Sequence, residues 1–282
     1  MTGLALRVAT CRALPEPDVD ELPLAEALAA GGFGAELVAW DDPAVDWDAA
    51  IPTILRSTWN YPLDIDAFVA WIDRASAAAA LYNPAAIVRD NVRKRYLLAL
   101  AARGVPVVPT TLVERGAGFP LATLDAASIV IKPEVGAGSL DTRRFAPADP
   151  AAAAHLAAIT ARGAALVQPY VASVDDHGER SLVWIDGELS HAIRKAPRFS
   201  GDDERVTGPF AIADDERAVA EAALAPYAGD LLYGRVDLAR DAHGAPCVME
   251  LELVEPSLFF ARGADVGAVD RFVTGLRRRL QM

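Results

Sequence analysis

The first third of the chain alternates short apolar runs with stretches in which apolar residues recur at helical spacing. The helical period is clearest at 64–79, where Ile65, Phe68, Val69 and Ile72 repeat every three or four residues. Regular alternation of strands and helices predicts a small parallel α/β domain. The expected strands are 4–10, 36–40 and 53–56, and the expected helices are 22–30 and 64–79.

The pattern changes after this domain. A linker-like stretch, NPAAIVRDN at 83–91, precedes a helix expected at 92–103. Asp186-Gly187 lies between two apolar runs, which predicts a β-hairpin. The other expected strands are 129–132, 166–170, 180–185, 188–194 and 232–239, and the other expected helices are 149–162, 216–227 and 266–280. This mixture predicts α+β lobes beyond the first domain.

Acidic residues gather on one face of a second predicted hairpin. In VMELELVEPS at 248–257, Glu250 and Glu252 are two positions apart, so on a strand both point to one side. Asp237 and Arg235 share a face of the preceding run in the same way. A tight turn at His243-Gly244 would pair Asp237 with Glu250 and Arg235 with Glu252. The residues expected on the opposite face are Met249, Leu251 and Leu253.

Three clustered carboxylates repel one another, so their placement needs a physical reason. A Mg²⁺ or Mn²⁺ ion held by Asp237, Glu250 and Glu252 would neutralise them and leave positions for phosphate oxygens. The alternative is the solvated face of an edge hairpin, where Arg235 offsets part of the charge. The apolar flanking runs favour the metal site.

A glycine-rich loop follows the strand that ends at Lys132. Its sequence, KPEVGAGSLDT, contains Gly136, Gly138, Ser139 and Thr142, whose backbone N–H groups could surround a phosphate. The loop lacks the features of a P-loop and of a dinucleotide fingerprint, and an ordinary hairpin turn is the alternative. A lysine at the end of an apolar strand favours the phosphate interpretation.

Three further stretches carry candidate binding groups. Lys94 lies in RDNVRKRYLL, where a solvated helix face is the alternative. Gln168, Tyr170 and Val171 surround Pro169, which supplies no N–H, so nearby backbone groups are free to meet a purine edge. The segment 190–199 concentrates cations in an acidic protein, which indicates an anion site or a solvated strand. A tight turn at Asp186-Gly187 predicts that Arg180 and Arg194 point to opposite faces of their hairpin unless a bulge intervenes.

Polar residues also follow the expected strand at 53–56. Arg56, Ser57, Thr58 and Asn60 should lie at the C-terminal end of this strand, where ligand sites of α/β sheets form. Their chemistry suits an amino-acid-like substrate. A packed loop with Trp59 in the core between domains is the alternative.

Composition narrows the class of protein. The 282 residues suffice for two or three lobes, and a net charge of −12 argues against nucleic-acid binding. No signal peptide and no apolar stretch long enough for a membrane span are present. Cys11 and Cys247 have no metal-like spacing and form no disulfide framework, which suits a reducing cytoplasm.

Taken in chain order, these motifs resemble the ATP-grasp superfamily and, within it, the glutathione-synthetase-like ligases. The segments LPEPDVDE, LRSTWNYP, IKPEVGAGSLDT, QPYV and DGELSHAIRKAP look like the bacterial subgroup of the O-ureido-serine cyclo-ligase of cycloserine biosynthesis. The resemblance implies an N-terminal pre-ATP-grasp domain and two lobes that clasp ATP. The implied segments are 1–88, 89–172 and 173–282.

The resemblance also implies roles for residues. Lys94 and Lys132 would hold the phosphates of ATP, the loop with Gly136, Gly138 and Ser139 would close over them, and Gln168 to Val171 would contact adenine. The ribose-binding acid is left open among Asp175, Asp176 and Glu179. Asp237, Glu250 and Glu252 would bind two metal ions, although many relatives have Asn in place of Glu252. The cations expected at the γ-phosphate or the acyl carboxylate are Arg194, Arg235, Arg180 and Arg205.

Such ligases convert a carboxylate to an acylphosphate, which an amine then attacks. The expected partners are therefore ATP, Mg²⁺ or Mn²⁺, and a small amino-acid-derived substrate, with neither nucleic acid nor membrane. Intermolecular ligation and cyclisation both remain open, as does the oligomeric state, a homodimer included. The alternative function is a scaffold that binds ATP without turnover.

Overall fold

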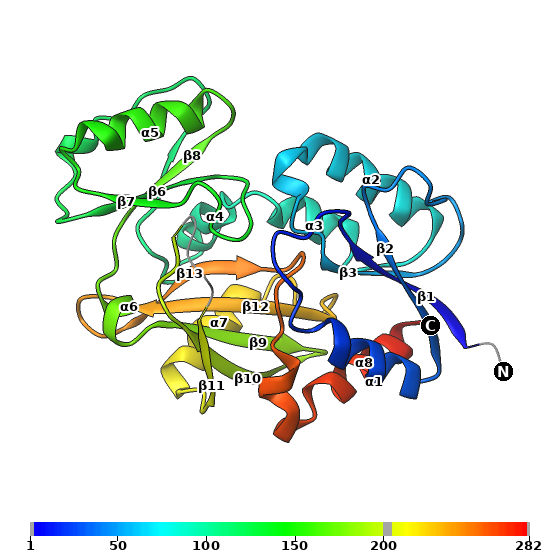
Figure 1. The fold of residues 1–282 in the computed structure, drawn as a ribbon. Coiled ribbons are helices and arrows are strands. Elements are labelled where there is room, and N and C mark those ends of the chain that lie inside the picture. The colour runs from blue at the N-terminus through cyan, green and yellow to red at the C-terminus, as the bar shows by residue number, and fades with distance from the viewer. Residues whose placement is uncertain (1–2, 200–204, 281–282) are drawn as a thin grey trace.

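The chain folds into three β-sheets (Figure 1). The structure is a computed structural model, and it describes residues 3–199 and 205–280. The first sheet is parallel, with strand order β2-β1-β3-β4, which confirms the predicted α/β arrangement. Its strands are β1 (Leu4–Thr10), β2 (Phe33–Ala39), β3 (Thr53–Ser57) and β4 (Leu81–Tyr82).

Helices α1 (Glu21–Ala30) and α2 (Ile65–Ala78) accompany this sheet. The carboxylate of Asp64 caps α2 by accepting a hydrogen bond from the backbone N–H of Ala67 at 3.0 Å. The helix buries Phe68, Trp71 and Ile72, so its predicted apolar stripe is the face turned to the core. A short 3₁₀ turn, η1 (Tyr61–Leu63), precedes it.

The second sheet is antiparallel, with strand order β5-β8-β6-β7. Its strands are β5 (Thr111–Val113), β6 (Ile129–Pro133), β7 (Arg143–Phe145) and β8 (Ala165–Pro169). Helix α5 (Pro150–Thr160) begins with Asp149 as cap and Pro150 in the first turn, and packs Leu156 against Ile131 and Val167. The 3₁₀ turn η2 (Leu121–Thr123) completes this lobe.

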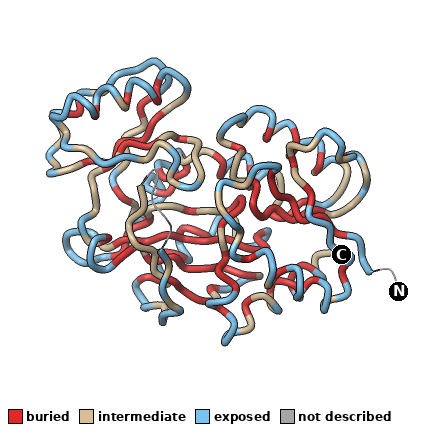
Figure 2. Tube along the Cα trace, in the orientation of Figure 1, coloured by how far each residue is buried: buried red, intermediate tan, exposed pale blue. Residues whose placement is uncertain are grey.

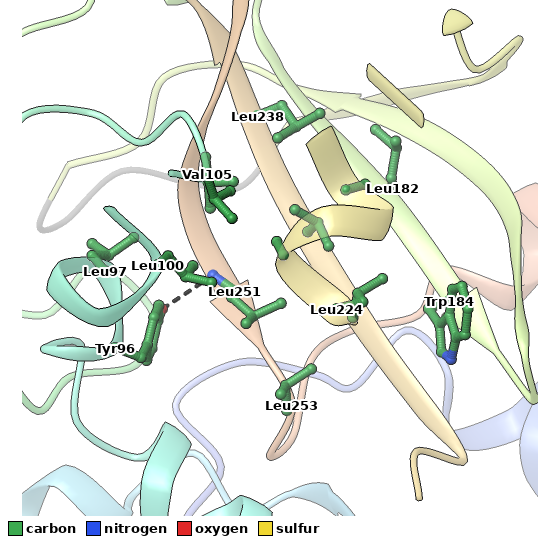
Figure 3. Close-up of a cluster of buried hydrophobic side chains, with 14 of the residues drawn as sticks. Tyr96, Leu97, Leu100, Val105, Leu182, Trp184, Leu224, Leu238, Leu251 and Leu253 are labelled. Carbon is green, nitrogen blue, oxygen red and sulfur yellow. Dashed lines mark hydrogen bonds between the residues drawn. The ribbon is translucent and has the colours of Figure 1, made fainter. Parts of the chain in front are cut away.

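The third sheet has strand order β11-β10-β9-β12-β13, with every pair antiparallel. Its strands are β9 (Glu179–Ile185), β10 (Glu188–Lys195), β11 (Val206–Phe210), β12 (Tyr233–Arg240) and β13 (Pro246–Glu252). Asp186 and Gly187 turn between β9 and β10 with φ of 47° and 102°, as a two-residue hairpin requires. One face of this sheet is apolar, and helix α7 (Asp214–Leu224) covers it (Figure 3).

The register of β12 and β13 confirms the predicted pairs, because Asp237 lies opposite Glu250 and Arg235 opposite Glu252. The turn itself differs from the prediction, since Leu238 pairs with Val248 and the register shifts at a bulge. Met249 is the extra residue of that bulge. It lines the same cleft as Glu250, whereas simple alternation had placed it on the apolar face.

The stretch expected to be a linker is helix α3 (Ala85–Asn91), so that interpretation was wrong. Asn83 donates to the carbonyl oxygens of Tyr233 and Leu253, and Asn91 donates to that of Leu251 and accepts from the N–H of Leu253. These amide side chains supply hydrogen bonds to backbone groups at the edge of the sheet, which would otherwise lack partners. Tertiary hydrogen bonds therefore order a segment that lacks a long apolar pattern.

Helix α4 (Tyr96–Ala102) begins four residues later than expected, which leaves Lys94 in the turn before it. The hydroxyl of Tyr96 accepts a hydrogen bond from the N–H of Leu251, visible as the dashed line in Figure 3. The segment from α3 to α4 thus holds the edge of β13, the strand that carries Glu250 and Glu252.

The C-terminal segment joins the first and third sheets. After the short helix α6 (Ser173–Asp176) and β9 to β13, the chain forms η3 (Phe260–Val266) and α8 (Ala268–Leu280). Phe272 and Leu276 of α8 pack with Leu28 of α1 and Ile185 of β9 in one buried cluster. Buried residues accordingly run through the strands of both sheets (Figure 2). Within the described residues, no helix has the length and apolarity needed to cross a membrane.

Candidate active site

A large cleft gathers residues from the second and third sheets and, from the first domain, residues of the segment that follows β3. Its empty volume, including the part open to solvent, is about 1570 Å³. The predicted residues that line it are Lys94, Lys132, Gly136, Gly138, Ser139, Gln168, Tyr170, Val171, Glu179, Arg235, Glu250 and Glu252.

Two lysines converge on one carboxylate at the centre of the cleft. The Nζ atoms of Lys94 and Lys132 lie 2.9 Å and 2.6 Å from the two carboxylate oxygens of Glu250. Burial alone would raise the pKa of Glu250, but the two ammonium groups outweigh it and hold that pKa well below its usual range. Glu250 is therefore a carboxylate, and both lysines are positioned beside it.

A second cluster lies on the same face of the third sheet. Arg235 donates to both oxygens of Asp237 at 2.9 Å and 3.0 Å and to Glu252 at 2.7 Å. Lys195 lies 2.7 Å from Asp237 and also pairs with Glu179. Burial opposes the charge on Asp237, yet Arg235 and Lys195 lower its pKa far below the ordinary value.

The two remaining acids of this face behave differently. Burial raises the pKa of Glu179 to about 7, although Lys195 partly opposes it. Burial also raises the pKa of Glu252, against the charge of Arg235. Both groups would gain from an additional cation, because a positive charge nearby favours their ionised forms.

The oxygen donors of Asp237, Glu250 and Glu252 suit Mg²⁺ or Mn²⁺ in type and charge. Each of these carboxylates is paired with a lysine or arginine, and within the described ranges no three His, Cys, Asp or Glu side chains are grouped closely enough to hold one ion. The donors therefore suit Mg²⁺ or Mn²⁺ in chemical type, while in this structure each carboxylate is held by a cationic side chain.

The glycine-rich loop borders the cleft, as predicted. Gly138, Ser139 and Asp141 all have positive φ, at 58°, 59° and 56°, so this loop follows a succession of tight turns. A Cβ atom added at Gly138 would meet nothing within 4 Å, so this glycine is required by its backbone conformation and not by crowding.

The three candidate ribose acids occupy different positions near the predicted adenine segment. Gln168 is buried and donates to the hydroxyl of Thr110 at 2.8 Å, while Tyr170 stacks under Arg144 with the guanidinium carbon 3.5 Å from its ring centre. Glu179 lines the cleft, but Asp176 is exposed and is not among the lining residues. Asp175 is hydrogen-bonded to the hydroxyl of Tyr170.

Three of the expected arginines lie away from the cleft lining. A bulge in β10 pairs Arg194 directly with Arg180, so the two share a face, and it is the face opposite Asp237. Arg180 is buried against Glu216 of α7, and Arg194 donates to the backbone oxygen of Asp176. Arg205 is exposed beside β11. The structure corrects the expected placement of these three groups, and for Arg194 the reason is the bulge, which was not visible in the sequence.

Lys195 and Arg198 take the places near the cleft that had been expected for those arginines. Lys195 lines the cleft beside Asp237, and Arg198 forms an ion pair with Glu16 at 2.8 Å. A compositional signal could have found Lys195. The chain has only three lysines, Lys94, Lys132 and Lys195, and all three line this cleft. The cationic side chains elsewhere in the sequence are arginines. The ammonium group is a compact point charge that suits phosphate oxygens.

The predicted substrate segment is buried scaffold. Arg56 is 1% exposed and pairs with Asp20 at 3.2 Å, and Ser57 donates to the hydroxyl of Thr10 at 3.0 Å. Thr58 is fully buried, and Asn60 bridges Trp40 and Asp41. None of these four residues lines the cleft, so the expectation that they contact substrate directly is corrected.

Their aromatic neighbours and the segment after β13 do line it. Trp59, Tyr61, Glu255 and Ser257 border one end of the cleft, next to Glu252. The segment VEPS at 254–257 follows the carboxylates in the sequence, but no role was predicted for it. Sequence distance hid the connection, because Trp59 meets Glu255 across 196 positions.

A cleft between two antiparallel lobes, lined by lysines and carboxylates and flanked by a parallel domain, is the arrangement of an ATP-grasp ligase. The comparisons with known proteins agree. A family described as the N-terminal domain of D-cycloserine synthetase DcsG matches residues 6–83. The cycloserine biosynthesis protein DcsG of Streptomyces lavendulae is 40% identical over 286 residues, which cover 94% of this chain and 95% of that protein.

Solved structures show the same fold. A crystal structure of D-cycloserine synthetase DcsG aligns with a TM-score of 0.88 and 37% identity, over 98% of this chain and 99% of that one. The ATP-grasp ligase PsnB, complexed with minimal precursor, Mg and ADP, aligns with a TM-score of 0.65 and 19% identity over 99% and 98%. The chain belongs to the DcsG family of ATP-grasp ligases and is an ADP-forming carbon–nitrogen ligase.

Proposed function

We propose that this ligase phosphorylates the carboxylate of a small amino-acid-derived molecule, and that an amine-type nitrogen then attacks the acylphosphate. The observation that carries the proposal is the convergence of Lys94, Lys132, Lys195 and Arg235 with three carboxylates on the face of the third sheet that borders the cleft. No serine or cysteine nucleophile is needed, because phosphoryl transfer of this kind depends on positioning and charge neutralisation.

In the first step, a substrate carboxylate oxygen bonds to the γ-phosphorus of ATP while the bond to the β-phosphate oxygen breaks and ADP leaves. Lys94 and Lys132 are placed to hold phosphate oxygens, since both already bind an oxyanion, the carboxylate of Glu250. Asp237, Glu250 and Glu252 would hold Mg²⁺, which when bound neutralises charge on the phosphate oxygens. Arg235 and Lys195 are placed for the transferred group.

The rest of the nucleotide has a matching surface. The loop at 136–142 would cover the phosphates, and Gln168 to Val171 would meet adenine at the far side of the cleft. Of the three acids considered for ribose, Glu179 is the one that lines the cleft, so we assign it that contact.

In the second step, nitrogen attacks the acyl carbon and phosphate leaves. The nitrogen comes from a second molecule or from the same one, and these phosphate-binding residues serve both routes. The name of the 40% identical relative, a cycloserine biosynthesis protein, favours ring closure of a serine-derived compound. We therefore place O-ureido-D-serine first among the compounds to test.

Two measurements test the proposal. Calorimetry on the full chain with Mg²⁺ should show ATP binding that Lys132→Ala weakens strongly, and ADP release should then depend on an amino-acid-derived carboxylate. Turnover with one compound alone indicates cyclisation, whereas a strict need for two indicates intermolecular ligation. ATP binding without ADP release across amino acids and their ureido and aminooxy derivatives would support the scaffold alternative instead.

A further inference from the structure

Glu255 lies on a backbone segment that is held from several sides. Its own carbonyl oxygen accepts from the indole N–H of Trp59 at 3.0 Å, and that of Pro256 accepts from Arg56 at 2.9 Å. Arg235 donates to the carbonyl oxygen of Ser257 at 3.0 Å. The position of Glu255 is therefore set by side chains from both the first and the third sheet.

Asp20 anchors the next three residues. Its carboxylate accepts from the backbone N–H groups of Leu258, Phe259 and Phe260 at 2.5 Å, 3.1 Å and 2.8 Å. Asp20 and its partner Arg56 are both fully buried, so this contact is screened little by solvent. The segment 255–260 is thus rigid at the point where it enters the cleft.

The side chain of Glu255 contrasts with this backbone. It is 9% exposed and lines the cleft, yet among the described residues its carboxylate has no ion pair and no hydrogen bond to another residue. The neighbouring acids Asp237, Glu250 and Glu252 all have cationic partners. Apart from a hydrogen bond with its own backbone, this mostly buried carboxylate thus has no partner in the described part of the chain to offset its charge, which is unfavourable unless a ligand supplies one.

The surroundings of Glu255 suit a cation. Trp59 and Tyr61 line the same end of the cleft, and Tyr61 is fixed by stacking on Phe68 at 4.9 Å between ring centres. Aromatic faces beside a carboxylate attract ammonium groups. Lys94 and Arg235 also act on Glu255, but each is already engaged with Glu250 or with Asp237 and Glu252.

We propose that Glu255 binds the ammonium group of the amino-acid substrate, an assignment that rests on the proposed function and narrows its substrate to α-amino acids. The acyl carboxylate of the same molecule would then point toward Arg235 and toward the lysines that would hold the phosphates. The pKa of Glu255 agrees with this role. Burial and then Glu252 raise it to about 8, and a bound ammonium would offset both effects.

The test compares O-ureido-D-serine with its analogue that lacks the α-amino group, 3-(ureidooxy)propanoate, in ADP release by the full chain with Mg²⁺ and ATP. Wild type should prefer the amino compound. Glu255→Gln should lower kcat/KM for that compound about 10- to 100-fold and leave the analogue unchanged, so that the preference disappears. Glu255→Asp should restore part of it, and Glu36→Gln, an exposed acid on β2, is the matched control.

The outcomes separate the inference from the function on which it rests. An equal fall for both compounds in Glu255→Gln, or no fall for either, overturns the ammonium site while leaving the ligase intact. If wild type binds Mg²⁺ and ATP but releases ADP with neither compound and with no amino acid, the proposed substrate class fails and the ammonium site fails with it. A melting temperature for each variant distinguishes lost binding from lost folding.

Discussion

Two polar stretches of this molecule differ in their position, because one lines the cleft and the other is buried in the interior. The carboxylate hairpin of β12 and β13 presents Arg235, Glu250 and Glu252 to the cleft, whereas residues 56–58 are buried away from it. Both looked like ligand sites in the sequence. The difference lies in their partners, because the charges of the hairpin are paired with lysines and Arg235 that line the cleft, while Arg56 is bound to Asp20 and to backbone oxygen.

This comparison shows that polarity at a strand end does not by itself indicate a substrate contact. A polar group is available to a ligand when the ligand can replace its present partner. Lys94 and Lys132 can exchange a carboxylate for phosphate oxygens, but the fully buried Arg56 cannot leave Asp20 without exposing a charge to a low-dielectric interior. The buried segment acts on the cleft indirectly, through the backbone of 255–260.

The largest effect is expected from Asp20→Ala, which would break the buried scaffold. This change removes the acceptor of three backbone N–H groups and leaves Arg56 without a counter-charge, so it should destabilise the fold by about 3–5 kcal/mol. The melting temperature should fall by roughly 10 °C. Glu26→Ala, an exposed acid on α1, is the control. Near-normal melting of Asp20→Ala would show that the anchor is not structural.

Lys132→Ala tests the opposite side of the comparison. It should lower the rate of ADP release about 10²–10³-fold because one oxyanion-binding cation is lost at the phosphates. Glu250 keeps Lys94 as a partner, so the melting temperature should change less than in Asp20→Ala. Arg115→Ala, an exposed cation, should change neither quantity. A loss of folding as severe as in Asp20→Ala would remove the contrast between the two regions.

Stability should also depend on pH through Glu255. The pKa of this group is about 8 in the folded protein against 4.5 as its ordinary value, so the folded state binds the proton more tightly. Its stabilising contribution is present at low pH and is lost as pH rises from about 4.5 to 8. Glu255→Gln stays neutral and should melt increasingly above wild type over this interval. Parallel melting curves from pH 5 to 9 would contradict the raised pKa.

The smallest effect is expected from Ser57→Ala. The hydroxyl of Ser57 is hydrogen-bonded to Thr10, so its loss should destabilise the fold by about 1 kcal/mol and leave KM for ATP and for the amino-acid substrate unchanged. Steady-state kinetics beside a melting curve separates the two effects. A rise of several-fold in KM for the amino-acid substrate would return this segment to the substrate site.

The sequence by itself determined the features that depend on neighbouring residues. Period-two alternation placed Asp237, Glu250 and Glu252 on one face, and the helical spacing of apolar residues predicted α2. The motif order also predicted the ATP-grasp fold, which the comparisons confirm. The division at 1–88, 89–172 and 173–282 stays a prediction, although each of the three sheets falls within one of these segments.

The tertiary structure alone decided which polar groups face the cleft. Bulges in β10 and β13 moved Arg194 away from it and Met249 into it, and a bulge depends on strand partners distant in the chain. Asn83 and Asn91 became structural because an edge strand some 150 residues later needed hydrogen bonds. Among the described residues, Glu255 differs from the neighbouring acids by lacking a cationic partner, which becomes visible only in the tertiary structure. Periodicity reports the direction of a side chain, whereas its hydrogen-bond partners are chosen by the packing of segments that the sequence does not place together.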